Sequence, residues 1–328
     1  MTTDSSLTAP GSPTRPEARQ AEPTRLLGGA AALFTVILWA AGLVATRFGV
    51  TGSLTLWDVI FLRLLLPALI LLPVLLRHPP RAPSAAIGRS RWPLLLAVLV
   101  SGAGLPFILT SSGGMVFAPA AHAGALMPGL MPLFAALLAA LLLGERFTSS
   151  RRFGMGLMLA GAMAVGGWQV LDDIGSNWIG ETWRGDLMFV AAGAMWACYT
   201  IAMKKSGLGI WQAAALVYVV SFLTYLPLYL LALESRLLAA PLFEIGVQLF
   251  QSVASGLLSM AAYGFAVRRL GAARASAFGA LTPALTALLA IPLLGEWPTL
   301  ITWAGIAAVS LGVALANGAL SRYIPTNR

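Results

Sequence analysis

The chain carries very little charge for its length. Only 10% of its 328 residues are Asp, Glu, Lys or Arg, whereas 58% are hydrophobic. A soluble domain of ordinary composition carries roughly 25% charged residues. Because so few charged side chains cannot cover a surface in water, the composition excludes an ordinary soluble domain and favours a protein embedded in the lipid bilayer.

Cysteine and histidine are also scarce. The one cysteine, Cys198, excludes an intramolecular disulfide. The two histidines, His78 and His122, belong to no His-Glu-x-x-His zinc motif. No pair of carboxylates lies deep in an apolar segment either. These absences argue against a metal site and against a nucleophile–base pair, so we expect neither an enzyme nor a cofactor.

Basic residues outnumber acidic ones, by 21 to 12, and the formal net charge is +9. Such an excess would fit a nucleic-acid partner only if the basic residues formed one patch. Here they are spread through short loops between apolar segments. We therefore expect the lipid bilayer and a small-molecule substrate as partners, and no nucleic acid.

Ten apolar segments are long enough to cross a bilayer, which takes about 20 helical residues. The third and fourth are separated near Gly113-Gly114 and Ala118-Pro119, where Gly and Pro favour a break. The predicted spans are 26–47, 54–76, 92–113, 118–143, 152–170, 185–205, 211–233, 245–267, 272–294 and 299–320. Residues 1–25, rich in Pro, Ser, Thr and charge, are predicted to form a disordered cytoplasmic tail.

The positions of the basic residues predict the orientation of these spans, because Lys and Arg in short loops favour the cytoplasmic side. With the N-terminus inside, seventeen of the 21 basic residues fall on the inner side. The exceptions are Arg47, Arg63, Arg184 and Arg236. We therefore expect a multi-pass protein of the cell membrane, the inner membrane of a bacterium, with both termini cytoplasmic.

One segment of the chain occurs twice. Residues Leu130–Thr148 match Leu281–Thr299 at 11 of 19 positions without a gap, always 151 residues apart. The matched residues include Pro, Gly and Glu, which a shared richness in Leu and Ala does not explain. The same offset relates two further glycine pairs, and these glycines, with Gly156, are predicted to allow close helix contact. The pairs are Gly154 with Gly305 and Gly161 with Gly312.

The repeat and the span count together predict an inverted architecture. Each half has five spans, an odd number, so the halves enter the membrane in opposite directions. Inverted repeats with a site near the midplane are typical of secondary transporters. We therefore predict an all-α integral membrane fold of ten transmembrane helices in two inverted five-helix repeats. The predicted parts are 26–170 (first repeat), 171–184 (outer linker), 185–320 (second repeat) and 321–328 (cytoplasmic C-terminal tail).

The motifs resemble those of EamA-type permeases in the drug/metabolite transporter superfamily. They include ILWAAGLVATRF (Ile37–Phe48), both helices that end in Leu-Leu-Gly-Glu, and the glycine-patterned helix after each of them. The resemblance covers nearly all of residues 26–320. It implies a helical bundle with a central cavity, alternating access, and often export of amino acids or other small metabolites. It does not indicate one substrate.

A polar stripe in the eighth span is the strongest candidate for a cavity wall. Its residues follow one another at helical spacings of three and four, with Gln251 beside them. Because polar side chains are costly in lipid, such a stripe faces either a cavity or a neighbouring helix. The stripe consists of Gln248, Ser252, Ser255, Ser259 and Tyr263.

Four residues of the first and sixth spans are further candidates for substrate binding. Trp39 and Thr46 share one helix face, and Trp196 and Tyr199 share another. The alternative is that these side chains only pack against other helices or face lipid. If they line the cavity, an apolar or aromatic substrate fits them.

Two ionisable residues within spans have alternative roles. His122 either contacts the substrate or a proton, or is a neutral histidine bonded to backbone. Arg63 either has a structural role, by snorkelling to the membrane interface or pairing with Asp58, or contacts an anionic group. The acidic residues within or beside the spans are predicted to lie near helix ends, so a proton relay built from carboxylates has no support. They are Asp58, Glu145, Glu244 and Glu296. Proton coupling through His122 is a hypothesis.

These observations predict a secondary transporter that exports small organic metabolites such as amino acids. A broad drug or toxic-compound exporter is the alternative within transport, and it would need a buried acid to bind a cation. A non-transporting scaffold is the other alternative, although it would need no polar stripe. The sequence predicts neither the substrate, the coupling ion, the direction of flux nor the oligomeric state.

Overall fold

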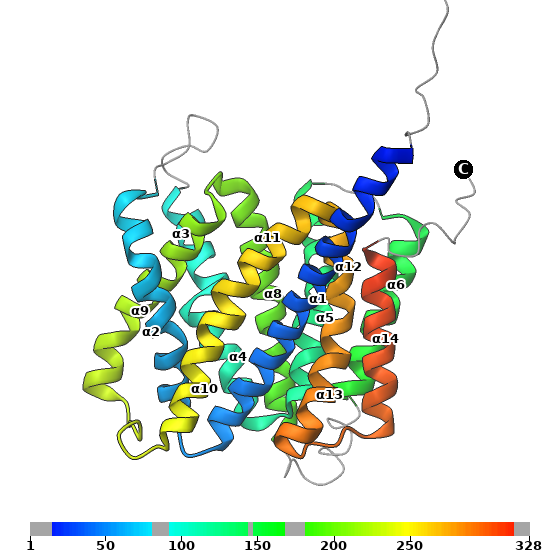
Figure 1. Cartoon of the computed structure of the whole chain (residues 1–328). Coiled ribbons are helices and arrows are strands. Elements are labelled where there is room, and N and C mark those ends of the chain that lie inside the picture. Colours follow the sequence, from blue (N-terminus) through cyan, green and yellow to red (C-terminus); the bar gives the residue numbers. More distant parts are fainter. Residues whose placement is uncertain (1–14, 81–91, 144–146, 168–180, 318–328) are drawn as a thin grey trace, which may run out of the picture.

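The computed structural model describes residues 15–80, 92–143, 147–167 and 181–317, and these form helices joined by turns, with no strand (Figure 1). The helices of the first half are α1 (Arg15–Thr51), α2 (Leu56–Arg77), α3 (Trp92–Ala103), α4 (Leu105–Phe117), α5 (Ala120–Leu143), α6 (Ser149–Ala162) and the π-helical η1 (Met163–Gly167). Those of the second half are α8 (Thr182–Ser206), α9 (Ile210–Ala232), α10 (Leu242–Val253), η2 (Ala254–Leu258), α11 (Ser259–Leu270), α12 (Ala272–Ala277), η3 (Phe278–Leu281), α13 (Thr282–Leu294) and α14 (Leu300–Ala316).

Eight of these helical stretches are long and apolar enough to cross a membrane. Three of them combine consecutive elements: α3 with α4, α10 with η2 and α11, and α12 with η3 and α13. The predicted spans 152–170 and 299–320 correspond to α6 with η1 and to α14, which are shorter helices. The chain is thus an all-helical membrane protein with multiple crossings.

Glycine and proline set several helix boundaries. The predicted break at Ala118-Pro119 is confirmed, since α4 ends at Phe117 and α5 begins at Ala120. The break at Gly113-Gly114 was wrong, because both glycines lie inside α4 and pack on α8. A Cβ on Gly114 would lie 2.6 Å from the Phe189 ring. Gly295 ends α13 in the left-handed conformation (φ 69°), as a C-terminal glycine commonly does.

The ends of the chain are described only in part. Helix α1 begins at Arg15, inside the segment predicted as a tail, so it starts well before the predicted first span. Residues 1–14 and 318–328 lie outside the described residues, as do Glu145, most of the predicted linker and the predicted C-terminal tail. In Figure 1, α1 begins and α14 ends at the same, upper end of the bundle.

The two halves share local structure as well as sequence. Thr148 caps the start of α6 by accepting a hydrogen bond from the Arg151 amide, and Thr299 caps α14 in the same way from the Thr302 amide. Thr148 and Thr299 are equivalent positions of the repeat. The halves also run oppositely: in Figure 1, α1 runs downward whereas α8 runs upward.

The core lies between the halves. The most extensive helix pairs each join one half to the other: α6 with α14, α5 with α8, α2 with α9, and α1 with α11. The largest buried cluster likewise draws on both halves, with Leu64, Leu126 and Met158 packed together with Phe189 and Val309. Any space at the centre of the bundle is therefore lined by both repeats.

Glycines allow α6 and α14 to touch along their backbones. A Cβ on Gly154 would lie 2.8 Å from the Gly312 carbonyl oxygen, and one on Gly161 would lie 2.6 Å from that of Gly305. The predicted close contact is therefore confirmed for these four glycines. The glycines that meet are not repeat equivalents of each other, because Gly154 meets Gly312 and Gly161 meets Gly305. The predicted contact was wrong for Gly156, which has nothing within 4 Å of an added Cβ because it lies on the outer face of α6.

Candidate functional site

The predicted polar stripe runs along α10, η2 and α11 and faces α1. The Trp39 indole N–H donates to Ser259 Oγ at 3.1 Å, and the Trp39 ring lies 5.7 Å from the ring of Tyr263. A Cβ on Gly42 would lie 2.7 Å from Ser255 Cβ. The stripe therefore lies where a helix of the second half meets the first helix of the first half.

Hydrogen bonds within the protein satisfy most of the stripe. Gln248 Nε2 donates to the Ala45 carbonyl at 2.7 Å, and Gln251 Nε2 donates to Gln248 Oε1 at 3.4 Å. Ser255 Oγ lies 2.8 Å from the Gln251 carbonyl, which accepts its proton. Gln248, Gln251 and Ser252 are buried, as packing of helices requires, whereas Ser255 remains partly accessible. The cavity-wall interpretation thus fits Ser255 and Tyr263 better than the glutamines.

A π-helical turn interrupts the stripe. Residues Ala254–Leu258 form η2 between α10 and α11. Within it, a Cβ on Gly256 would lie only 2.7 Å from the hydroxyl oxygen of Tyr218, on α9. Such π-bulges are frequent at functional sites. Sequence reasoning missed Tyr218, because nothing in α9 distinguishes it from a packing residue.

Arg63 connects helices of both halves. Its Nη1 donates to Thr46 Oγ1 at 3.1 Å, and the Thr46 hydroxyl donates in turn to the Gly42 carbonyl at 2.8 Å. On its other side Arg63 interacts electrostatically with Tyr218, which also interacts with Tyr199. Arg63 on α2 is thereby linked to α1, α9 and α8.

Trp196 and Tyr199 belong to an aromatic group that also includes Phe107 of α4. The Trp196 ring lies 5.3 Å from that of Phe107 and 5.2 Å from that of Tyr199. Phe107 is buried, whereas Trp196 and Tyr199 are partly accessible. Because Tyr199 interacts with Tyr218, this aromatic group is connected to Arg63.

His122 has a different environment from the other predicted site residues. It is buried on α5, and its Nδ1 lies 2.9 Å from Oδ1 of Asp186 on α8. Asp186 Oδ2 has no hydrogen-bond partner among the described residues. The acidic residues considered from the sequence did not include Asp186, which lies near the start of α8 like the others near helix ends, but is buried. The side chain of His122 thus pairs with a carboxylate of the other half rather than with backbone.

The predicted pairing of Arg63 with Asp58 does not form. Asp58 is buried at the start of α2, and its carboxylate accepts five hydrogen bonds from other groups. The donors are the Thr55 amide and hydroxyl, the Tyr229 and Ser235 hydroxyls, and the Arg236 amide. Asp58 thus joins α2 to the end of α9.

Glu296 joins three segments at the lower end of the bundle. Its Oε1 accepts from Arg47 Nε at 2.6 Å, and its Oε2 accepts from the Ala120 amide at 2.8 Å. Arg47 also donates to the Met115 carbonyl. This confirms the expected place of Glu296 at a helix end and interface.

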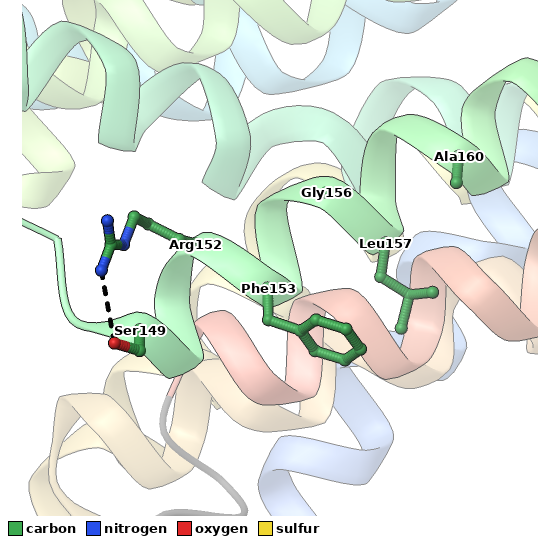
Figure 2. A pocket seen from close by; sticks show the side chains of 6 residues that line it. All are labelled: Ser149, Arg152, Phe153, Gly156, Leu157 and Ala160. Atoms are coloured by element: carbon green, nitrogen blue, oxygen red, sulfur yellow. Dashed lines mark hydrogen bonds between the residues drawn. The ribbon is translucent and has the colours of Figure 1, made fainter.

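A surface groove lies apart from these residues. Figure 2 shows its six lining residues on a single helix, α6, with Arg152 bonded to Ser149 at 3.3 Å. The remaining lining residues are Phe153, Gly156, Leu157 and Ala160. Because Phe153 is 67% exposed and no predicted site residue takes part, the groove belongs to the outer surface.

Comparison with known proteins agrees with these features. A related protein of Streptantibioticus cattleyicolor, described as a "Probable terminal-alkyne amino-acid exporter", is 27% identical over 300 residues, covering 88% of this chain and 92% of the relative. A solved crystal structure superimposes with a TM-score of 0.57 at 18% identity, over 93% of this chain and 100% of that one, which supports the fold alone. The model of the EamA-like transporter family matches residues 26–167 and again residues 183–318. The chain therefore belongs to the EamA-like transporter family.

Proposed function

We propose that the protein is a secondary transporter that exports small organic metabolites, such as amino acids, by alternating access at a central cavity. Membership of the family supports transport rather than catalysis. The exporter named for amino acids supports this substrate class. The observation that carries the proposal is that Arg63 of α2 contacts Thr46 of α1 and is connected, through Tyr218 of α9, to the aromatic side chain of Tyr199 on α8 in the other half.

The proposal includes the inverted architecture. In this architecture, α6 together with η1 is the fifth transmembrane helix and α14 is the tenth. The repeats 26–170 and 185–320 face opposite ways across the membrane. The equivalent caps at Thr148 and Thr299 and the opposite directions of α1 and α8 support this arrangement. The distribution of Lys and Arg supports cytoplasmic termini in a bacterial inner membrane.

The proposed substrate contacts come from residues predicted on the sequence. Trp39, Ser255 and Tyr263 would contribute from the α1–α11 interface, and Trp196 and Tyr199 from α8. All five are partly accessible although they lie on helices of the bundle interior. Other predicted residues would support this wall through their hydrogen bonds rather than touch the substrate. They are Thr46, Gln251, Ser252 and Ser259.

Proton coupling forms part of the same proposal. Imidazole changes charge near neutral pH, and a carboxylate beside it can share that proton. His122 and Asp186 lie on helices of different halves, so gain or loss of a proton there would change a contact between the repeats. In this proposal His122 takes part in proton coupling instead of the direct substrate contact that was predicted for it.

One observation favours the alternative of a broad drug exporter. Such a protein needs a buried acid to bind cationic compounds, and Asp186 is buried with one free carboxylate oxygen among the described residues. Its other oxygen is already paired with His122, however, and the aromatic group of Trp196 and Tyr199 is connected through Tyr218 to a cation, Arg63, rather than to an acid. Metabolite export therefore remains the better supported function.

Counterflow in liposomes tests the proposal. Purified protein is reconstituted with an unlabelled amino acid inside, and entry of the same labelled amino acid is followed across a panel that includes cationic drugs. We expect accelerated exchange of at least one amino acid over protein-free liposomes, and net flux driven by an imposed pH gradient. Exchange of cationic drugs alone would favour the alternative. No exchange of any solute, with insertion verified, would contradict transport.

A further inference from the structure

Arg63 is the cation that lies deepest among the described residues of α2. It follows the first residue of that helix, Leu56, by seven positions, or about 10 Å along the axis. Its side chain is only partly covered by the rest of the protein. Because a charged side chain at this depth is costly in lipid, we take its accessible part to face the interior of the bundle.

Arg63 has little compensation for its charge. A guanidinium group offers five N–H donors, and the described residues supply one hydrogen-bond acceptor, Thr46 Oγ1. No described carboxylate forms an ion pair with it, since Asp58, Asp186 and Glu296 are bound to other partners. A buried charge without a counter-charge is costly, so the site favours an anion.

The surroundings of Arg63 define what else such an anion would carry. Tyr218 interacts electrostatically with Arg63, and its hydroxyl lies against the π-helical turn at Gly256. Tyr199 and Trp196 continue from Tyr218 as an aromatic surface. A ligand bound here thus has one charged end at Arg63 and an apolar or aromatic part along the aromatic group.

We infer that Arg63 binds the carboxylate of the transported metabolite, through the forked pair of N–H donors that matches two carboxylate oxygens. This inference rests on the proposed function and narrows it to carboxylates with an apolar or aromatic side chain. Arginine binds carboxylates in this bidentate way, whereas lysine offers only a point charge. A single guanidinium balances the single charge of a carboxylate better than the double charge of a phosphate ester.

Binding of phenylalanine and its analogues tests this role without requiring transport. Labelled L-phenylalanine is bound to purified protein and displaced by 3-phenylpropionate, which keeps the carboxylate, or by phenethylamine, which lacks it. We expect 3-phenylpropionate to compete and phenethylamine to fail. Arg63→Gln is expected to weaken phenylalanine binding about tenfold or more, with partial recovery in Arg63→Lys.

A matched surface variant controls for the loss of one positive charge. Arg184→Gln removes an exposed arginine that pairs with Glu181, and it should leave phenylalanine binding unchanged. The inference is overturned if phenethylamine or phenyl phosphate displaces phenylalanine better than 3-phenylpropionate does. It is equally overturned if Arg63→Gln binds phenylalanine as the unmodified protein does. In either case, continued counterflow of amino acids would leave the proposed function standing.

Discussion

Replacing Asp58 with alanine is expected to destabilise the protein by on the order of 3 kcal/mol, because it removes the acceptor of five hydrogen bonds at once. Two of the donors are backbone amides, of Thr55 and Arg236, which cannot turn to find another partner. The substitution therefore loosens the start of α2 from the end of α9. Thermal unfolding of purified protein in detergent, followed by tryptophan fluorescence, measures the effect.

Asparagine at this position sharpens the test. In Asp58→Asn, the amide oxygen can still accept from the two backbone amides, and the hydroxyls of Tyr229 and Ser235 can rotate to accept from the new N–H group. We therefore expect a fall in melting temperature smaller than that of Asp58→Ala. Glu181→Ala is the control, because that carboxylate is exposed and its ion pair among the described residues is with Arg184, three positions along the chain. Equal melting temperatures for Asp58→Ala and the control would refute the role of this network.

Replacing Gly161 with leucine is expected to separate α6 from α14. An added Cβ already lies 2.6 Å from the Gly305 carbonyl oxygen, which is backbone and cannot move aside. Helix association in lipid depends on such close packing, because lipid removes the hydrophobic drive between helices. Overpacking typically costs about 1–3 kcal/mol, and a side chain of this size should reach or exceed that range. Melting temperature and the fraction of monodisperse protein in size-exclusion chromatography report the loss.

Gly156 provides the matched control, since it is a glycine of the same helix with open space around an added Cβ. Gly156→Leu should leave the melting temperature unchanged or raise it slightly, because glycine is a poor helix former. Similar losses in the Gly156 and Gly161 variants would contradict this account, because leucine improves helix propensity at both positions and only Gly161 contacts α14.

Local signals in the sequence predicted much of the fold. The break at Ala118-Pro119 follows from proline chemistry, which acts within a few residues. The contact of Gly161 with Gly305 follows from the repeat, because equivalent glycines in two similar helices present equivalent narrow faces. Gly156 shows the limit of that reasoning: it was grouped with these glycines, but the position 151 residues later is Ala307, and Gly156 lies on the exposed face of α6.

The site was harder to predict because its contacts join distant residues. His122 and Asp186 are 64 residues apart, and no local pattern brings them together. The serines and glutamines of α10 and α11 illustrate a second difficulty. A polar stripe on a transmembrane helix turns away from lipid both when it packs against another helix and when it lines a cavity. Only the observed packing against α1 distinguishes a helix contact from a cavity wall. For Arg63, the occupied carboxylate of Asp58 removes the predicted pairing with that residue.

The orientation of the two repeats can be measured at equivalent positions. Ser149 follows the cap of α6 and Leu300 follows the cap of α14, 151 residues later, and both are exposed. Each is changed to cysteine in a Cys198→Ser background and treated in intact cells with a membrane-impermeant maleimide. An inverted pair predicts that Leu300→Cys reacts at once and that Ser149→Cys reacts only after the membrane is opened. Reaction of both variants from the same side would contradict two halves that face opposite ways around a shared site.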